Sequence, residues 1–244
     1  MTAELCCLTV RVDTTRWSET VLEEVDLVVP AGQITAVLGG PGAGKSMAAS
    51  ALAGRLPATA QSRGQVLIDG EVADDQRWPA LRDRVVGYVP QEGVTAFDTQ
   101  KTVGAHLRAL ECSHRAWSVE RACAAAHYPV EAADLLPDQH SGGQIQRAAL
   151  AAALLPAPRV LIADGPTNSL DMGTAYGVWR SLRDYADSGA AVLVVSNEVR
   201  MLTHGGVADR MVILHAGRVL AAGTTAELGK STDPFVRTLL RSAF

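Results

Sequence analysis

The sequence predicts an α/β protein with a mainly parallel core sheet, an N-terminal antiparallel β subdomain and an inserted α-helical subdomain. Three observations predict this fold. Short apolar segments typical of buried strands alternate with segments whose apolar residues recur at helical spacing. A glycine-rich loop follows one of these strands and precedes a helix. Between about residues 92 and 157, helical patterns follow one another without a convincing strand.

The first half of the chain contains the strands and the loop that define the core. Residues 5–12 read as a strand, and residues 21–29 alternate apolar and polar positions. Residues 33–38 are apolar and rich in β-branched side chains, which is typical of a buried central strand. The glycine-rich loop comes next, followed by the segment MAASALAGRL with Ala and Leu at helical spacing. Two further strands are expected, at 64–70 and 84–89.

The alternation of strands and helices returns after the insert. Ser141 opens a helix, and RVLIAD at 159–164 is an apolar strand that ends in an acid. A short helix is expected after Asn197. The other elements expected in this half are a helix at 174–187, a buried strand at 190–196, and strands at 211–215 and 218–222.

Composition and charge exclude several classes of protein. The chain has 244 residues, of which 48% are hydrophobic and 20% charged, as in ordinary globular proteins. Its formal net charge is −4, and it contains no dense run of Lys and Arg. Proteins that bind nucleic acid through phosphate contacts usually carry a basic stripe. Nucleic acid is therefore not expected as a partner.

Metal-binding cysteines and membrane spans are not expected either. The four cysteines show no CxxC spacing, so neither zinc nor a disulfide framework is predicted. The N-terminus lacks the basic and apolar regions of a secretion signal. The longest apolar run, at 148–155, ends at Pro156 and falls short of the roughly 20 residues of a spanning helix. If the protein has a membrane-associated function, it is expected to act at the membrane surface through other chains.

The glycine-rich loop GGPGAGKS matches the phosphate-loop pattern G-x-x-x-x-G-K-[ST]. Glycines let main-chain amides turn toward phosphate oxygens, and the helix that follows points its positive end at the same place. Lys45 can reach the β- and γ-phosphates, and the Ser46 hydroxyl can ligate Mg²⁺. The pattern predicts a loop that binds the phosphates of a nucleotide together with Mg²⁺, as in P-loop NTPases; the alternative is a structural glycine-rich turn. The residues expected to contact nucleotide here are Gly39, Gly40, Pro41, Gly42, Ala43, Gly44, Lys45, Ser46 and Met47.

Motifs farther along the chain distinguish among P-loop proteins, since the loop alone leaves kinases, GTPases and motors open. SGGQ at 141–144, followed by Gln146 and Arg147, resembles the signature motif of ATP-binding cassette (ABC) proteins. Other matches keep the order and spacing of that family over nearly the whole chain. They are Trp17 (the aromatic residue that stacks on adenine), Gln91 (the Q-loop glutamine), Asp164 (the Walker B aspartate) and Ser169, Leu170 and Asp171 (the D-loop).

The resemblance implies a nucleotide-binding domain over residues 1–244, with residues 92–157 as its helical insert. Mg²⁺ would be held by Ser46, Gln91 and Asp164. In the family the signature residues Ser141, Gly142, Gly143 and Gln144 cap the nucleotide of the other subunit, so two ATP molecules lie between two subunits. The partners implied are a second ATP-binding subunit, two transmembrane permease subunits and an extracytoplasmic solute-binding protein, with this chain at the cytoplasmic face of the membrane.

Three positions depart from the family pattern. The family usually has a glutamate after the Walker B aspartate, where this chain has Gly165. It also has a histidine after the next buried strand, where this chain has Asn197, and His204 lies beyond that strand end. These changes predict slow hydrolysis at this chain's own site, and a heterodimer with a catalytically complete partner. His140 replaces the leucine that usually precedes SGGQ.

Several segments resemble the subgroup of importers for oligopeptides, dipeptides and nickel. These are residues 54–70, residues 92–107 and residues 233–240, the last a divergent form of a C-terminal motif. The permease is expected to dock near residues 91–104. Three alternatives are a soluble cassette ATPase acting on ribosomes or DNA, a purely regulatory nucleotide-binding subunit, and a small-molecule P-loop kinase. The kinase would leave SGGQ and the D-loop residues unexplained.

Overall fold

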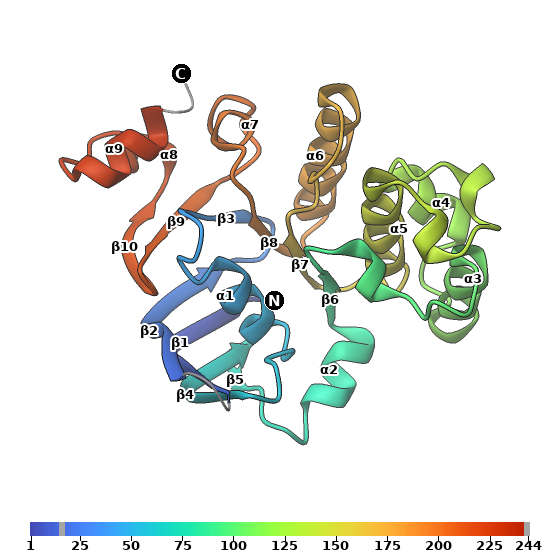
Figure 1. Cartoon of the computed structure of the whole chain (residues 1–244). Coiled ribbons are helices and arrows are strands. Elements are labelled where there is room, and N and C mark those ends of the chain that lie inside the picture. The colour runs from blue at the N-terminus through green and yellow to red at the C-terminus, as the bar shows by residue number, and fades with distance from the viewer. Residues whose placement is uncertain (15–17, 242–244) are drawn as a thin grey trace.

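A computed structural model of the chain describes residues 1–14 and 18–241. Within those residues, a small antiparallel sheet and a larger central sheet are surrounded by helices (Figure 1). The small sheet has the strand order β2-β1-β4-β5. Its strands are β1 (Ala3–Asp13), β2 (Ser18–Val29), β4 (Ala60–Ile68) and β5 (Glu71–Val72).

The central sheet has the strand order β10-β9-β3-β8-β7-β6. Its four pairings from β9 to β6 are parallel, and only β10 runs antiparallel to its neighbour. Every residue of β3, β7 and β8 is buried, because helices and the small sheet cover both faces. The strands are β3 (Ile34–Gly39), β6 (Val86–Val89), β7 (Val160–Asp164), β8 (Ala191–Val195), β9 (Arg210–His215) and β10 (Arg218–Gly223).

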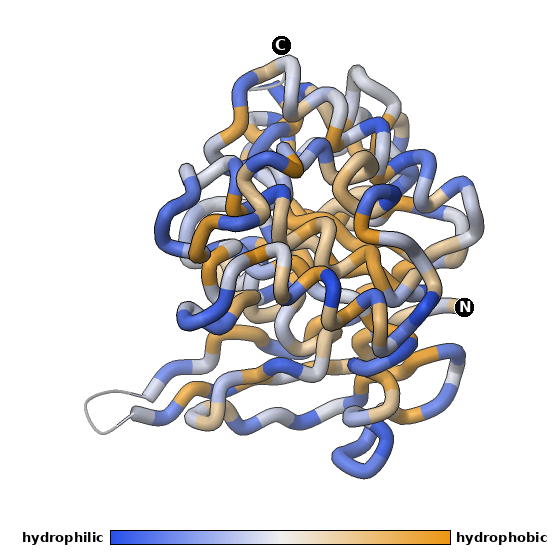
Figure 2. The backbone as a smooth tube through the Cα atoms, turned by 90° about the vertical axis from the view of Figure 1, so that its right-hand side faces the viewer, coloured by the Kyte–Doolittle hydropathy of each residue, from blue (hydrophilic) through white to orange (hydrophobic). Residues whose placement is uncertain are grey.

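The helices fall into groups on either side of the central sheet (Figure 1). α1 packs between the central sheet and the small sheet, in a core that includes Leu5 and Leu52. The other face is covered by α3, α5, α6 and α7, with Leu150 and Trp179 fully buried there. Figure 2 shows the apolar segments gathered in the middle of the molecule. The helices are α1 (Lys45–Leu52), α2 (Trp78–Arg84), α3 (Val103–His114), α4 (Val119–Ala125), α5 (Gly142–Leu154), α6 (Met172–Asp187), α7 (Val199–His204), α8 (Thr225–Leu228) and α9 (Pro234–Arg241).

The predicted fold class is confirmed, with corrections at the edges of elements. β4 begins at Ala60 rather than at residue 64, because its polar first half pairs with β1. Arg84 ends helix α2 instead of opening a strand. The segment at 233–240 forms most of α9, a helix that the sequence pattern did not predict. None of the helices in the described residues has the length and apolar character to cross a bilayer.

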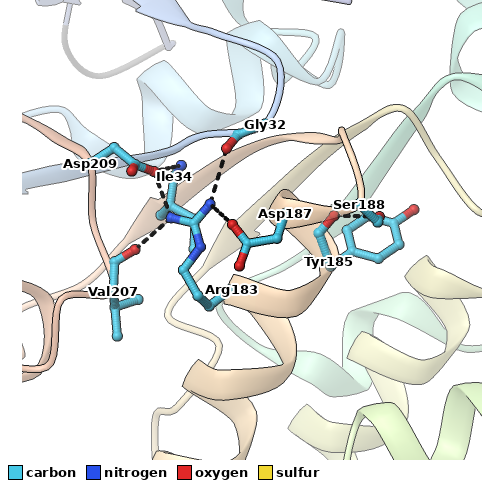
Figure 3. Close-up of polar contacts among 8 residues, drawn as sticks. All are labelled: Gly32, Ile34, Arg183, Tyr185, Asp187, Ser188, Val207 and Asp209. Atoms are coloured by element: carbon cyan, nitrogen blue, oxygen red, sulfur yellow. Dashed lines mark hydrogen bonds and ion pairs between the residues drawn. The ribbon is translucent and has the colours of Figure 1, made fainter.

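A polar cluster fastens α6 to the amino-terminal edge of the central sheet (Figure 3). Arg183 lies at its centre and is largely buried. Its guanidinium donates to the Asp209 carboxylate at 2.6 Å, and that carboxylate also accepts the Ile34 amide at 2.7 Å. The other acceptors of Arg183 are the carbonyls of Gly32 and Val207 and the carboxylate of Asp187. This edge is opposite the end of β3 that leads into the phosphate loop.

Candidate functional site

The phosphate loop joins the end of β3 to the start of α1 and adopts a conformation that requires glycine. Gly39 and Gly44 have φ angles of 151° and 95°, in the region that L side chains rarely adopt. A Cβ on Gly44 would also lie 2.6 Å from the Leu22 side chain. In contrast, a Cβ on Gly40 or Gly42 would meet no atom within 4 Å, so the outer side of the loop is open to a ligand.

Lys45 folds back over this loop. Its ammonium donates to the carbonyls of Gly39 and Gly40, both at 2.9 Å. Burial lowers the pKa of Lys45, and the negative charge of Asp164 partly opposes that effect. A half-buried ammonium with only carbonyl acceptors is well placed to receive phosphate oxygens.

Ser46, Gln91 and Asp164 come together from three elements of the fold. Ser46 lies in the first turn of α1, Gln91 follows β6, and Asp164 ends β7. The Ser46 hydroxyl donates to the Gln91 side-chain oxygen at 3.4 Å. Asp164 is 3% exposed, and burial raises its pKa, although the Ser46 hydroxyl and the Lys45 charge act in the opposite direction. Hydroxyl, amide and carboxylate oxygens are the ligands that Mg²⁺ accepts together with phosphate and water.

These residues line a cavity of about 330 Å³. Part of the predicted phosphate loop and the predicted metal ligands meet there. The described residues contain no cluster of three or more His, Cys, Asp or Glu that could hold a metal alone. A metal would therefore depend on phosphate oxygens, as Mg²⁺ bound to ATP does. The lining residues are Pro41, Gly42, Lys45, Ser46, Gln91, Asp164, Gly165, Asn168, Val195, Ser196 and Asn197.

Two of the three departures from the family pattern, Gly165 and Asn197, lie in this cavity. Gly165 has a φ angle of 62°, and its amide donates to the Val195 carbonyl at 2.9 Å. A Cβ at this position would overlap the side-chain amide of Asn168. Among the residues that the structure describes, Asp164 is the one acidic residue in this lining, which also carries the side-chain amides of Gln91, Asn168 and Asn197.

Glu198 links the segment after β8 to the turn after β7. Its carboxylate accepts the Thr167 hydroxyl at 2.8 Å and the Trp179 indole N–H at 2.9 Å. Thr167 and Trp179 are both buried. Asn197 and Asn168 are thus held on two segments that one carboxylate fastens together. The side chain of His204 and the whole of Trp17 lie outside the described residues.

The signature residues do not line the cavity of their own chain. Ser141 caps α5: its hydroxyl accepts the Gln144 amide at 3.2 Å, and its own amide donates to the Gln144 side chain at 2.9 Å. Ser141 and Gly142 are exposed, while Gly143 is buried. A Cβ on Gly143 would lie 2.8 Å from atoms of Ser169 and Leu170, so the signature and D-loop segments are packed together. Asp171 caps α6 by accepting the Thr174 amide at 3.0 Å.

His140 fixes the segment before the signature motif. One ring nitrogen lies 2.9 Å from the Leu136 carbonyl, and the other lies 2.8 Å from the Tyr128 hydroxyl. The carbonyl can only accept, so Nδ1 carries a proton, and in the neutral ring Nε2 accepts from the phenol. The two rings also stack, with centroids 5.9 Å apart. A leucine could make neither polar contact, so the histidine gives this chain a distinct anchor.

Sequence reasoning missed Asn168 and Ser196 as lining residues. Asn168 lies between two recognised motifs, and its position four residues after Asp164 was the available signal. Ser196 directly follows β8, so it lies at the same carboxyl edge of the sheet. Both positions follow from the rule that ligands bind beyond the carboxyl ends of parallel strands.

Comparison with known proteins identifies the family. Residues 22–168 match the ABC transporter family. The chain is 36% identical over 234 residues to a multidrug efflux ATP-binding/permease protein of Mycobacterium bovis, covering 91% of this chain and 18% of that protein. It is 30% identical over 225 residues to the oligopeptide transport ATP-binding protein OppD of Mycobacterium bovis, covering 86% of this chain and 36% of OppD. This chain is thus much shorter than either relative.

A solved structure of an ATP-binding cassette has the same fold as this chain. The dimeric post-hydrolysis state of an ATP-binding cassette bound to ADP and Pi superposes with a TM-score of 0.79 at 25% identity, covering 91% of this chain and 98% of that one. The relatives include both an efflux protein and a peptide transport protein, so they select no transport subgroup. The matched segment runs from β2 through the phosphate loop and the signature motif to the turn after Asp164. The chain therefore belongs to the ABC transporter family and has the fold of its ATP-binding cassette.

Proposed function

We propose that this chain binds ATP and Mg²⁺ and powers a membrane transporter through ATP-driven association with a second cassette. The observation that carries the proposal is the convergence of Lys45, Ser46, Gln91 and Asp164 on one cavity beside an open glycine loop. Each group has the chemistry that a metal-bound triphosphate requires.

The residues of this chain have separate roles in that site. Lys45 exchanges its two loop carbonyls for phosphate oxygens, and the loop amides and the start of α1 favour negative charge. Ser46, Gln91 and Asp164 hold the metal, which neutralises charge on the phosphates when bound. We assign Trp17 to the adenine, as the family resemblance implies.

Replacement of Lys45 by alanine tests nucleotide binding. Loss of one partner of a largely desolvated charged contact costs about 2 kcal/mol or more, so ATP affinity should fall on the order of 30-fold. Isothermal titration calorimetry of the purified chain measures it. Unchanged ATP affinity in Lys45→Ala would refute the proposed binding site.

Hydrolysis at this chain's own site is proposed to be slow. Gly165 supplies no base, and Asn197 supplies no charge at the place expected for the γ-phosphate. General-base assistance is worth about 10²–10⁴-fold in rate. A single-turnover assay of the assembled transporter, with the nucleotide at each site counted separately, tests this. Equal rates at both sites would contradict it.

The second cassette is proposed to be a different, catalytically complete chain. Ser141, Gly142 and the D-loop residue Ser169 are exposed and do not line their own cavity. They are free to cover the nucleotide of a partner, where a glutamate and a histidine would complete the chemistry. The cassette would extend over residues 1–244, with residues 92–157 as its helical insert.

The permease subunits are proposed to dock in a groove beside the Q-loop. A hollow of about 300 Å³ lies between β6, α3 and α5, and small apolar side chains form much of its wall. The transported substrate is proposed to be a peptide, nickel or another metal chelate, supplied by an extracytoplasmic solute-binding protein, with this chain at the cytoplasmic face. Copurification of the complex and a transport assay with each substrate class test this. The lining includes Arg55, Tyr88, Pro90, Ala96, Leu110, Ala149 and Ala153.

A purely regulatory nucleotide-binding subunit is the second candidate, favoured by the absence of an acid at Gly165. The exposed signature residues distinguish the two candidates. Ser141→Ala should abolish ATPase activity of the complex if this chain completes the partner's site, and should leave it unchanged if the chain only regulates. A cassette ATPase outside transport would instead copurify with ribosomes or DNA.

A further inference from the structure

Gln146 lies in the first half of α5 and is 2% exposed. The three hydrogen bonds of its amide group all go to main-chain atoms. Its nitrogen donates to the Pro90 carbonyl at 2.9 Å and to the Gly165 carbonyl at 3.2 Å. Its oxygen accepts the Gly93 amide at 2.9 Å. These partners fix the orientation of the amide, because carbonyls can only accept and a main-chain N–H can only donate.

The three partners of Gln146 surround the expected metal ligands. Pro90 and Gly93 lie on either side of Gln91, and Gly165 directly follows Asp164. One side chain therefore holds the main chain at both ends of the Gln91 segment and beside Asp164. These contacts join residues 19 to 56 positions apart in the sequence.

The main chain of the Gln91 segment also lies directly on α5. A Cβ on Gly93 would lie 2.7 Å from the Ile145 carbonyl and 2.9 Å from the Gln146 Cα. α5 begins at the signature motif, whose capping residue Ser141 precedes Gln146 by little more than one helical turn. Movement of this helix would displace the Gln91 segment, because the main chains of the two segments are in van der Waals contact and no space separates them.

We propose that Gln146 is a positioning residue that holds Gln91 at the metal and ties its position to the signature helix α5. The proposal rests on the ATP and Mg²⁺ site proposed above. Gln146 does not line the cavity, so it acts on the metal only by holding the Pro90–Gly93 segment, with the Gly165 carbonyl as its fixed partner on the other side. Its loss should weaken the contribution of Mg²⁺ to ATP binding, and leave metal-free ATP binding intact.

The test compares ATP affinity with Mg²⁺ and with EDTA in four proteins: the unmodified chain, Gln146→Met, Gln91→Ala and the double variant. Methionine keeps the length of glutamine and removes its hydrogen bonds. Loss of a group that orients a metal ligand typically lowers metal affinity about 10–100-fold, so the gain in affinity from Mg²⁺ should fall by that factor in Gln146→Met. The double variant should lose no more than Gln91→Ala, because Gln146 acts through Gln91.

Tyr185→Phe is the matched control. It removes another buried side-chain hydrogen bond to a carbonyl, from Tyr185 to Pro158 at 2.6 Å, away from the cavity. It should leave the effect of Mg²⁺ unchanged, even if it lowers the melting temperature. A full Mg²⁺ effect in Gln146→Met, or additive losses in the double variant, would overturn the proposal.

Hydrogen exchange of the unmodified chain gives a second measurement if Gln146→Met does not fold. ATP with Mg²⁺ should slow exchange of residues 90–97 in the unmodified chain, and should not do so in Gln91→Ala. If Mg²⁺ does not change the hydrogen exchange of residues 90–97 in either protein, the proposal is also overturned. Failure of the ATP site itself is a separate outcome, because it would appear as unchanged ATP affinity in Lys45→Ala.

Discussion

At the scale of single residues, the two charged groups of the cavity are held in a state that a ligand would relieve. Burial lowers the pKa of Lys45 and raises the pKa of Asp164, so the surroundings disfavour both charged forms. A bound phosphate supplies an acceptor for the ammonium, and a bound cation supplies a partner for the carboxylate. Ligand binding should therefore stabilise the chain by mass action.

Asp164→Asn should separate stability from binding. The pKa of Asp164 is raised, so its contribution to folding is most favourable below the usual aspartate pKa and is lost as the pH rises through the raised value. At neutral pH the neutral asparagine should raise the melting temperature of the nucleotide-free chain, and weaken Mg²⁺-dependent ATP binding about 10-fold or more. Calorimetry measures both; a lower melting temperature at neutral pH would contradict the expectation.

The pair of His140 and Tyr128 makes a second prediction at this scale. Burial raises the pKa of Tyr128 to about 12. The neutral phenol is therefore favoured in the folded chain, and this stabilisation is complete below about pH 10, the usual tyrosine value, and is lost as the pH rises toward 12. Tyr128→Phe should show a smaller loss of stability over that interval in pH-dependent denaturation. At neutral pH it should cost about 1 kcal/mol, since His140 loses a donor.

The third prediction concerns hydrolysis when a glutamate is introduced at position 165. Gly165→Glu must adopt a left-handed main chain, φ 62°, and displace the Asn168 amide. A non-glycine residue in that region costs about 1–2 kcal/mol, so the variant should fold with reduced stability. Its single-turnover hydrolysis should rise by about 10²-fold if a base is the main deficit. Gly165→Gln carries the same backbone cost without a base, and a similar rise in that control would contradict the reasoning.

At the scale of elements, α6 depends on Arg183 for its attachment to the sheet. The guanidinium is largely buried and has two carboxylates and two carbonyls as partners. Removing one partner of a buried charged network costs about 3–5 kcal/mol, so Arg183→Ala should lower the free energy of unfolding by about 3 kcal/mol. Arg84→Ala is the control, because its contact with Asp83 is exposed and should be worth less than about 1 kcal/mol. Urea denaturation measures both.

The sequence predicts the inner strands well because burial on both faces leaves long apolar runs, as in β3, β7 and β8. It predicts exposed element boundaries and short helices poorly. The exposed first half of β4 and the short helices α2 and α9 form through contacts with distant segments, which local patterns do not contain. The same reason explains which parts of the candidate site the sequence predicts. Motif residues such as Lys45 were predicted, whereas the hydrogen bonds of Gln146 span up to 56 positions and have no local signal.

At the scale of the whole molecule, the nucleotide cavity and the signature segment are separate surfaces of one chain. Ser141→Ala should therefore leave ATP binding by this chain unchanged, and abolish hydrolysis by the complex. The substitution also removes a helix cap, worth about 1 kcal/mol. Thr224→Ala is a matched control, because Thr224 caps α8 with the same reciprocal bonds to Glu227. Equal ATPase activity in both variants would contradict a role for Ser141 in the partner's site.

The close packing of Gly143 against Ser169 and Leu170 has a genetic consequence. In the proposed dimer, the surface that these segments share covers the nucleotide of the partner, so damage to it would impair the site on another polypeptide. In the proposed heterodimer, alleles altered in the phosphate loop should impair nucleotide binding by this chain, and alleles altered in the signature segment should impair hydrolysis at the partner's site. Suppressors of the signature-segment alleles should map to the gene of the partner cassette rather than to this one.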